Sequence, residues 1–495
     1  MRVEGLGRLV TVLIAMLGVG SAASGADLPA RPNIVWMIAE DMSANFACYG
    51  ETTITTPNVD RLAAEGVKFD RAFVTGPICS ISRSALITGM YQTSIGAQHH
   101  RSGRGELKIQ LPPGITPLPK LFKDAGYHTS NLNIENFTKQ GGAVPIAKTD
   151  YNFEWDKSMY DKTHWSTRSS GQPFFAQVQL NGGKLRGRGD GEQWPRRAEQ
   201  ALGSRTPASA VKLPPYLPDD PVIREDWAQY LDTVRYTDWE VGRVLERLKE
   251  AGELDKTVVF FMTDHGISHV RNKQFLYDGG IHVPLVARGP KLKPGTVRSD
   301  LVQQIDVAAT SLAIAGIANP ATMQARDLLA ENYEPRRYVF AARDRADETV
   351  DRIRGVRSEQ YKLIRNFHPN RPYLQPNAYK DGKPIVQAMR RLHAEGKLTP
   401  EQALIMRETR PAEELYDLKK DPYELENLAD DPARQDVLKE LRGVLDDWIT
   451  RTDDRGRNPE PPEMYDSDMA VAGGNGKGPA RRNIETMKKW ATEGK

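Results

Sequence analysis

Cysteine is scarce in this sequence of 495 residues, which contains only Cys48 and Cys79. Two cysteines form at most one disulfide within the chain, so a small domain held together by many disulfides is excluded. An excess of one charge is also lacking, because 68 Lys and Arg residues face 65 Asp and Glu residues, for a net charge of +3. This balance excludes the strongly basic composition of a general nucleic-acid binder. The hydrophobic content of 39% excludes a mostly disordered chain.

Long hydrophobic runs are absent as well. The apolar run at residues 9–19 is much shorter than the ~20 residues that a membrane-spanning helix needs. It follows Arg2 and Arg8 and precedes the small residues 20–26, which is the pattern of a cleaved secretory signal. We therefore predict a signal peptide over residues 1–26, export to the periplasm or the exterior, and no stable membrane anchor. An uncleaved N-terminal anchor is the alternative.

Strand-like and helix-like segments alternate through the rest of the chain. Residues 33–39 and 257–262 are continuous apolar runs, typical of buried parallel strands. Apolar residues recur at helical spacing within residues 225–252. This alternation predicts an α/β fold with a large, mostly parallel central sheet flanked by helices. We also expect strands at 173–180 and 283–289, and helices at 58–66, at 118–127 and from about residue 83.

The sequence changes in character near residue 330, where shorter strand-like runs are broken by turns. We predict a large α/β domain over residues 27–330 and a smaller C-terminal α+β domain over residues 331–450, with a helix at 436–450. Residues 451–495 are rich in Gly, Pro and charge, which predicts an extended or disordered tail.

Acidic and metal-binding residues follow the two most strongly apolar strands. Glu40 and Asp41 end the first, and Asp264 and His265 end the second. Ligands bind at the carboxyl ends of strands in open α/β sheets, so these groups would hold one divalent cation between them. Three carboxylates favour calcium or magnesium over zinc. The alternative is that they are ordinary loop acids that cap helices.

A motif at residues 76–92 indicates what Glu40, Asp41, Asp264 and His265 could do. Cys79, Arg83 and the pair Thr88-Gly89 stand at the spacing Cys-x-Pro-x-Arg-x4-Thr-Gly, which resembles the signature of the sulfatase family. The resemblance implies an alkaline-phosphatase-like fold in which residues 27–330 form the catalytic domain. It spans residues 31–448 and looks closest to the branch of the heparan N-sulfatases (sulfamidases) and their bacterial relatives.

The resemblance also implies a chemistry for Cys79. A maturation enzyme would oxidise it to formylglycine, whose hydrate attacks sulfur with one hydroxyl and releases the bound sulfate with the other. Arg83 would hold the anionic oxygens, because a guanidinium suits paired oxygens, and Lys273 matches a lysine that contacts the sulfate. A disulfide between Cys48 and Cys79 would be incompatible with this role, so we expect Cys48 to be a free thiol. The resemblance places one calcium ion at five residues: Glu40, Asp41, Cys79, Asp264 and His265.

The sequence departs from the family pattern at several positions. Ile81 replaces the proline that the maturation enzymes read, and Glu40 replaces an aspartate. The usual Gly-Lys-x-His segment is missing, so we assign its lysine to Lys148 and the place of its histidine to Asp150. Lys184 stands near the position of a histidine that protonates the leaving group. A lysine does so only if its pKa is lowered.

Other charged residues are candidates for substrate binding. His99 and His100 follow the signature, and their alternative is a hydrogen-bonded loop pair. His282 would line the mouth of the pocket or simply pack. Arg343 and Arg345 suit an acidic sugar, although a salt-bridged strand face explains most of the charges around them.

Together these features predict an exported, calcium-dependent sulfatase that hydrolyses sulfate esters, or N-sulfates, of a sulfated polysaccharide or oligosaccharide. Its expected partners are the sulfated saccharide and a formylglycine-generating enzyme. Two alternatives remain open. One is a phosphoryl or phosphonate hydrolase on the same scaffold, and the other is a degenerate sulfatase that binds sulfated glycan without turnover.

Overall fold

The computed structural model describes residues 31–139, 141–187, 193–472 and 478–495. The signal peptide expected at residues 1–26 lies outside the described residues. Within the described part of the chain, no helix has the length and apolar character needed to cross a membrane.

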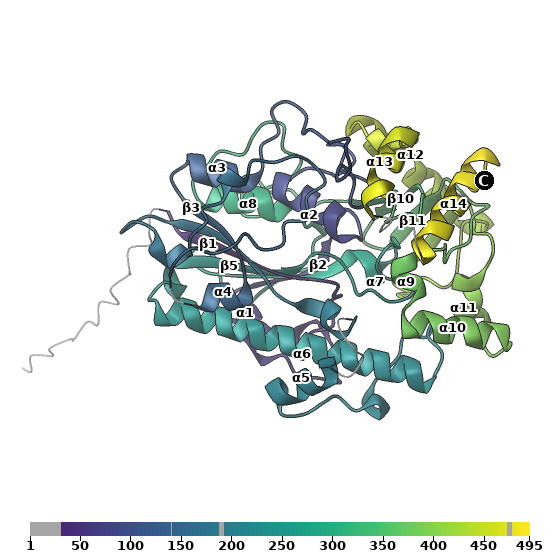
Figure 1. Cartoon of the computed structure of the whole chain (residues 1–495), viewed down its shortest axis with the longest axis horizontal. Helices are drawn as coiled ribbons and strands as arrows, with labels where there is room; N and C mark the ends of the chain where they lie inside the picture. Colours follow the sequence, from purple (N-terminus) through teal and green to yellow (C-terminus); the bar gives the residue numbers. More distant parts are fainter. Residues whose placement is uncertain (1–30, 140, 188–192, 473–477) are drawn as a thin grey trace, which may run out of the picture.

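A mixed, mostly parallel sheet forms the centre of the molecule (Figure 1). Its order is β3-β4-β1-β5-β6-β2-β7, with β8 paired to β2. β1 runs parallel to β4 and β5, whereas β6 runs antiparallel to β5 and β2. The strands are β1 (Asn33–Ala39), β2 (Val67–Phe73), β3 (His128–Asn133), β4 (Phe174–Gln179), β5 (Thr257–Thr263), β6 (His282–Arg288), β7 (Thr296–Arg298) and β8 (Val302–Gln303).

Helices cover both faces of this sheet, which confirms the predicted fold class (Figure 1). One face carries α1 (Pro57–Ala64), α4 (Ile134–Thr138) and the long α6 (Pro221–Glu250). The other carries α2 (Cys79–Thr88), α3 (Leu118–Asp124) and α8 (Asp306–Ile314).

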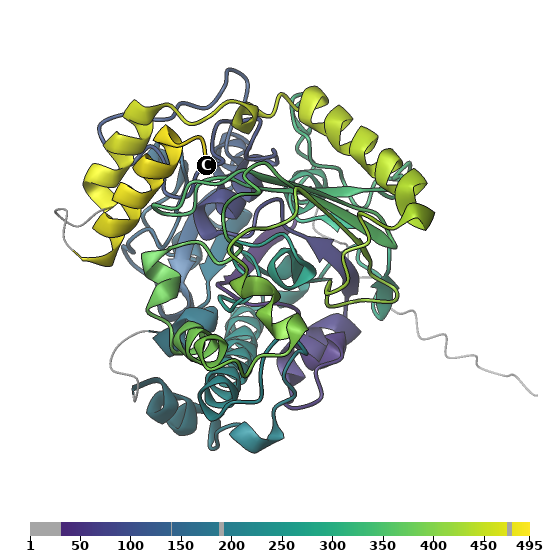
Figure 2. The ribbon, with the colours of Figure 1, turned by 90° about the vertical axis from the view of Figure 1, so that its right-hand side faces the viewer.

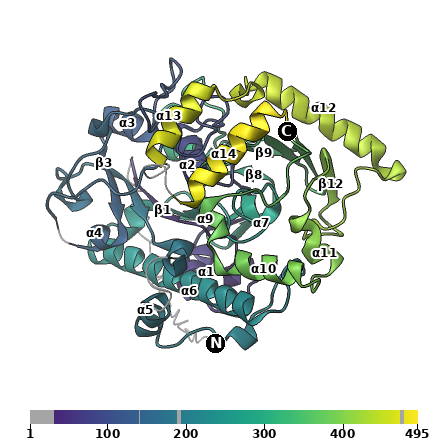
Figure 3. The same cartoon turned by 45° about the vertical axis from the view of Figure 1, so that its right-hand side comes forward.

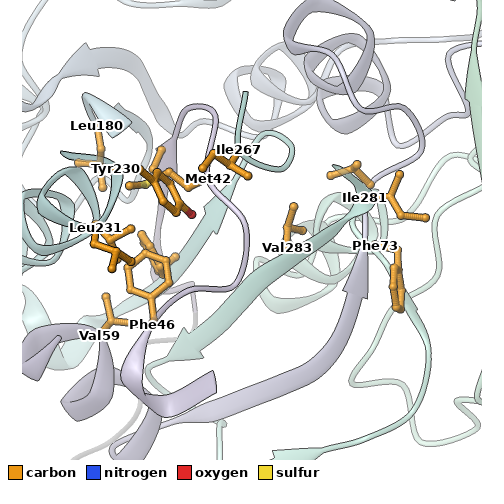
Figure 4. Packing of buried hydrophobic residues seen from close by; sticks show 14 of the residues in the cluster. Met42, Phe46, Val59, Phe73, Leu180, Tyr230, Leu231, Ile267, Ile281 and Val283 are labelled. Atoms are coloured by element: carbon orange, nitrogen blue, oxygen red, sulfur yellow. The ribbon is translucent and has the colours of Figure 1, made fainter. Parts of the chain in front are cut away.

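The side chains of β1 alternate between two apolar cores, as strand geometry requires. Val35 and Met37 face the core beneath α6, and Trp36 faces the core beneath α3. Figure 4 shows Met42 and Phe46, which follow β1, packed with residues of α6. The segment that leaves β1 is therefore anchored on both sides of its polar residues.

A second, antiparallel sheet follows, with order β12-β11-β10-β9. Its strands are β9 (Val339–Arg343), β10 (Ile353–Arg357), β11 (Tyr361–Asn366) and β12 (Glu413–Asp417). The helix α12 (Gln435–Arg451) lies beside this sheet (Figure 2). It buries Leu438, Leu441 and Trp448 in the core that it shares with the sheet. Further helices before residue 451 are α5 (Gln193–Leu202), α7 (Asp278–Ile281), α9 (Ala378–Asp381), α10 (Pro384–Ala394) and α11 (Pro400–Ala403).

The C-terminal tail differs from the expectation of an extended or disordered segment. It forms α13 (Pro462–Ala472) and α14 (Pro479–Thr492), and α14 lies beside α9 (Figure 3). Tyr465 and Met469 stand one helical turn apart in α13, and the fold buries them together with Met487 of α14 in one small cluster.

Candidate functional site

Two neighbouring strands place four polar side chains at one edge of the central sheet. β1 runs into Glu40 and Asp41, and β5 runs into Asp264 and His265. The strands are parallel and their last residues pair in register. The Asp41 amide donates to Asp264 Oδ1 at 3.1 Å, and all four side chains are buried. Asp41 has a positive φ of 54°, a strained backbone of the kind that concentrates at functional sites.

The helix α2 begins at Cys79 rather than near residue 83. Ile78 is extended, and its carbonyl accepts the first helical bond, from the Ser82 amide at 2.9 Å. Cys, Ser and Ile are only moderate helix formers, which is why propensity placed the start too late. As the first residue of a buried helix, Cys79 lies where the helix dipole favours negative charge.

The Cys79 sulfur lies at the centre of the polar cluster. Its Sγ is 3.1 Å from His265 Nε2 and 3.7 Å from Asp41 Oδ1. Asp41, Cys79 and His265 thus offer three donor atoms within 4.8 Å of one another, a group that could hold a metal ion. Both cysteines are free, so Cys48 forms no disulfide with Cys79.

Three lysines surround the sulfur and the carboxylates. Lys273 Nζ lies 3.3 Å from Cys79 Sγ and 3.0 Å from Asp41 Oδ1. Lys184 Nζ lies 3.5 Å from the sulfur and 2.5 Å from Glu40 Oε2. Lys148 Nζ lies 2.7 Å from Glu40 Oε1. The structure therefore brings together three lysines that lie far apart in the sequence.

Arg83 ties the signature helix to both strand ends. Its Nε donates to Asp264 Oδ2 at 3.0 Å, and its Nη1 donates to Gln179 Oε1 at 2.7 Å. Its Nη2 lies 3.6 Å from Glu40 Oε1. Helical geometry turns residues i and i+4 to the same face, so the spacing of Cys79 and Arg83 points both toward the carboxylates.

Burial and charge act in opposite directions on the titratable groups. Burial raises the pKa of the Cys79 thiol, but Lys273, Lys148 and Lys184 outweigh burial and lower it to about 7. Burial would lower the pKa of His265, yet Asp264 and Cys79 raise it to about 10. The cluster thus favours an anion at position 79 and cations around it.

Two glycines press the Lys184 segment against the end of β1. The Gly183 amide donates to the Glu40 carbonyl at 2.7 Å. A Cβ on Gly182 would lie 2.2 Å from the Glu40 carbonyl oxygen, and one on Gly183 would lie 2.3 Å from that of Asp41. Only glycine permits so close an approach of the two backbones. This approach places the Lys184 ammonium group within 3.5 Å of the Cys79 sulfur.

Lys184 is charged in this setting. Burial would lower its pKa, but Cys79, Asp41 and Glu40 raise it above the ordinary range of lysine. The condition for a lysine to act as a proton donor, a lowered pKa, is therefore not met. Its position suits the holding of an anion.

The Lys148 segment reaches the site from the carboxyl end of β3. The Ala147 amide donates to the Asn131 carbonyl at 2.9 Å, and Asn131 Nδ2 donates to the Lys148 carbonyl at 3.2 Å, so this segment lies alongside the end of β3. Asp150 lies 3.5 Å from Lys148 Nζ and pairs with Arg104. Asp150 therefore helps to hold the Lys148 ammonium group beside Glu40.

The two histidines that follow the signature contact Ser80 and Arg345 rather than the Cys79 sulfur. His100 Nδ1 hydrogen-bonds Ser80 Oγ at 2.7 Å, and the Arg345 amide donates to His99 Nδ1 at 3.3 Å. Burial lowers the pKa of His100 to about 3 and that of His99 to about 4. Both rings are neutral and hydrogen-bonded within the protein.

The remaining candidates have partners in the fold. His282 Nε2 bonds the Asp70 carbonyl at 2.8 Å, outside the cluster around Cys79. Arg343 is buried and pairs with Asp351. Arg345 is buried and pairs with Glu460 at 2.7 Å and Asp468 at 2.6 Å. These three residues are not brought to the sulfur.

Comparison with known proteins identifies the family. Residues 32–317, more than half of the chain, match the family described as Sulfatase. The chain belongs to the sulfatase family. It is therefore a sulfuric ester hydrolase. Residues 265–381 of this sulfatase also match the family described as N-sulphoglucosamine sulphohydrolase, C-terminal.

Three relatives show how far the similarity reaches. An ulvan-active sulfatase of Formosa agariphila is 35% identical over 482 residues, covering 89% of this chain and 78% of its own. The N-sulphoglucosamine sulphohydrolase of Homo sapiens is 26% identical over 470 residues, covering 86% and 91%. A structure solved with its substrate D-glucosamine-2-N,6-O-disulfate has a TM-score of 0.60 at 20% identity, covering 86% and 98%. The last likeness shows the alkaline-phosphatase-like fold.

Two residues of the sulfatase site were missed by sequence reasoning. Gln179, which accepts from Arg83, ends β4, so the rule that directed us to the ends of β1 and β5 would have found it. The Tyr379 hydroxyl donates to Asp41 Oδ2 at 3.0 Å. No local signal marks Tyr379, because it reaches the site from a distant segment.

The donor set of this sulfatase fits calcium. Asp41 and Asp264 offer carboxylate oxygens with no exposed surface, and Glu40 adds a third carboxylate. Hard oxygen donors suit this cation. Such close carboxylates repel one another unless cations neutralise them. Lys273 supplies one such positive charge, because its Nζ lies 3.0 and 3.2 Å from the two Asp41 oxygens.

Proposed function

We propose that this sulfatase removes sulfate from a sulfated polysaccharide or oligosaccharide, as an O-sulfate or an N-sulfate, using formylglycine at position 79 and one calcium ion. The observation that carries the proposal is the convergence of Lys184 and Lys273 on the Cys79 sulfur, beside buried carboxylates that Arg83 holds through Asp264. The ulvan-active relative at 35% identity supports a polysaccharide substrate.

When present, the hydrated aldehyde at position 79 would supply an oxygen nucleophile, and calcium held by Glu40, Asp41, Asp264 and His265 would polarise the sulfate oxygens. Lys273 and Lys184 lie within 3.5 Å of the sulfur that the nucleophile replaces, so both reach the oxygens of a sulfate bound there. Their fixed charges stabilise the negative charge that builds up during transfer.

Arg83 and Lys148 act on the carboxylates rather than on the sulfate. Arg83 holds Asp264 and Gln179 in place, and Lys148 holds Glu40. We assign these two residues to positioning of the metal-binding groups. Lys184 contacts both Glu40 and the sulfur, and so connects the two sets of residues.

We further propose that residues 27–330 form the catalytic domain and residues 331–450 a smaller C-terminal domain. The hydroxyl of Tyr379 supports a shared site, because it contacts Asp41 from the C-terminal part. We also propose export to the periplasm or the exterior, with residues 1–26 removed. N-terminal sequencing of the exported protein tests this last proposal, and an intact N-terminus would contradict it.

The function is tested by turnover of sulfated oligosaccharides from ulvan and from heparan sulfate, measured as released sulfate. The protein is coexpressed with a formylglycine-generating enzyme. Cys79→Ala removes the precursor of the nucleophile and should abolish release. Cys48→Ala changes the other free cysteine and should leave release unchanged. Tight binding without release in the wild type would favour the degenerate binder, and release of the alcohol from a phosphonate ester alone would favour the other hydrolase.

A further inference from the structure

A lysine beside the catalytic cluster has no role in the mechanism above. Lys383 Nζ lies 4.5 Å from the centre of the Tyr379 ring, and Lys273 Nζ lies 4.7 Å from the centre of the same ring. The two ammonium groups thus flank a single aromatic side chain. Because the hydroxyl of that ring donates to Asp41, Lys383 lies next to the sulfate-binding residues.

Lys148, Lys184 and Lys273 each pair with a buried carboxylate of the site, whereas Lys383 forms no such pair among the described residues. Its ammonium group forms no hydrogen bond or ion pair with any residue in the described ranges, apart from its contact with the Tyr379 ring. Its surface is only partly exposed. Burial and the charge of Arg186 lower the pKa of Lys383 to about 8. A cation held near other cations is stabilised by an anion that binds between them.

Arg186 adds a second cation, close enough for its charge to act on Lys383. Its side chain is 4% exposed, and its Nη1 donates to the Gly183 carbonyl at 3.2 Å. Its Nε donates to Asp226 Oδ1 at 3.4 Å, and Asp226 is shared with His269. Nη2 is buried and has no hydrogen-bond acceptor among the described residues. A buried donor of this kind is costly unless a ligand or water accepts from it.

Tyr379 supplies a surface for a sugar ring. It is 37% exposed, although it lies against buried residues of the cluster. An aromatic ring that is hydrogen-bonded through its hydroxyl and partly exposed suits contact with the apolar C–H groups of a saccharide. A sugar in contact with the exposed part of this ring lies close to the ammonium groups of Lys273 and Lys383.

We propose that Lys383, Arg186 and Tyr379 form a second anion subsite, which binds a carboxylate or a second sulfate of the glycan next to the sulfate that is removed. This inference rests on the proposed function, because it takes the cluster around Cys79 as the first subsite. The substrate class is then a glycan with at least two acidic groups on the same or adjacent sugars.

The test compares Lys383→Met with Lys383→Arg, which keeps the charge. Lys397→Met is the matched control, because Lys397 is 65% exposed and pairs with Glu395 after α10. The substrates are 4-nitrophenyl sulfate, with one anionic group, ulvan oligosaccharides, and the same oligosaccharides after chemical reduction of their carboxyl groups.

We expect Lys383→Met to lower kcat/KM on the oligosaccharides about tenfold or more, mainly through KM, and to act little on 4-nitrophenyl sulfate. Lys383→Arg should retain most of the activity, and Lys397→Met all of it. A deficit that persists after carboxyl reduction identifies the second anion as a sulfate. A deficit that disappears identifies it as a carboxylate.

Two results would overturn the subsite. One is an equal loss on the oligosaccharides and on 4-nitrophenyl sulfate, which would mean that Lys383 supports the common site. The other is no loss on the oligosaccharides. If the wild type turns over none of these substrates, the proposed function fails, and calorimetric binding of the oligosaccharides decides the subsite separately. Weaker binding by Lys383→Met than by Lys383→Arg supports it, and equal binding contradicts it.

Discussion

The close approach of Gly183 to Asp41 gives a sharp test of how the site is held. In Gly183→Ala the added Cβ would lie 2.3 Å from the Asp41 carbonyl oxygen, whereas ordinary contacts begin at 3.4 Å. The two segments must therefore separate by roughly 1 Å, and both carry site residues, since Asp41 is on one and Lys184 follows on the other. A displacement of this size costs about a hundredfold in rate when reacting groups must stay aligned.

The assay for Gly183→Ala is kcat/KM on a sulfated substrate, together with a thermal melt. We expect kcat/KM to fall about a hundredfold, with a loss of stability of about 1–3 kcal/mol from overpacking. Gly443→Ala is the control, because Gly443 lies within α12 with no atom near its Cβ position. That change should leave activity intact and stabilise the helix by about 0.5–1 kcal/mol. Unchanged activity in Gly183→Ala would refute the view that this contact positions Lys184.

Four further predictions follow from the site. Tyr379→Phe keeps the ring but removes the donor to Asp41, and we expect kcat/KM to fall about tenfold, whereas a fall of less than twofold would contradict the contact. In unconverted protein, Lys273→Met should raise the Cys79 pKa from about 7, because it removes the strongest nearby cation; ultraviolet absorbance of the thiolate against pH measures this, and an unchanged pKa contradicts it. Removal of calcium by a chelator should lower the melting temperature by an amount that calcium restores and zinc does not, since Asp41 loses its neutralising cation. Ile81→Pro should increase the fraction of formylglycine, measured by peptide mass spectrometry, because it restores the proline that the maturation enzymes read. The helix accepts this proline, since residue 81 lies in the first turn of α2.

Much of the fold could be predicted because its signals are local. The apolar runs of β1 and β5 and the helical spacing within α6 depend only on neighbouring residues, and each appears within a few residues of the expected bounds. The antiparallel direction of β6 could not be predicted in this way, because strand direction is decided by the connections between elements. The helices of the tail could not either, since their buried residues pack with one another across α13 and α14 and with Val350.

The same distinction applies to the site. Glu40, Asp41, Asp264 and His265 could be placed together because parallel strands end at one edge of a sheet. The place of Lys184 depends on two glycines packed against β1, a contact that no spacing rule contains. Arg343 and Arg345 suggested a sugar subsite because of their charge, whereas in the structure Asp351, Glu460 and Asp468 pair with these arginines.

The central claim is that Cys79 becomes the nucleophile of a sulfatase site despite Ile81. Peptide mass spectrometry across residue 79, on protein coexpressed with a formylglycine-generating enzyme, tests this claim most directly. We predict an aldehyde or its hydrate at position 79 and an unmodified thiol at Cys48. An unmodified thiol at Cys79, or a disulfide between the two cysteines, would contradict the claim.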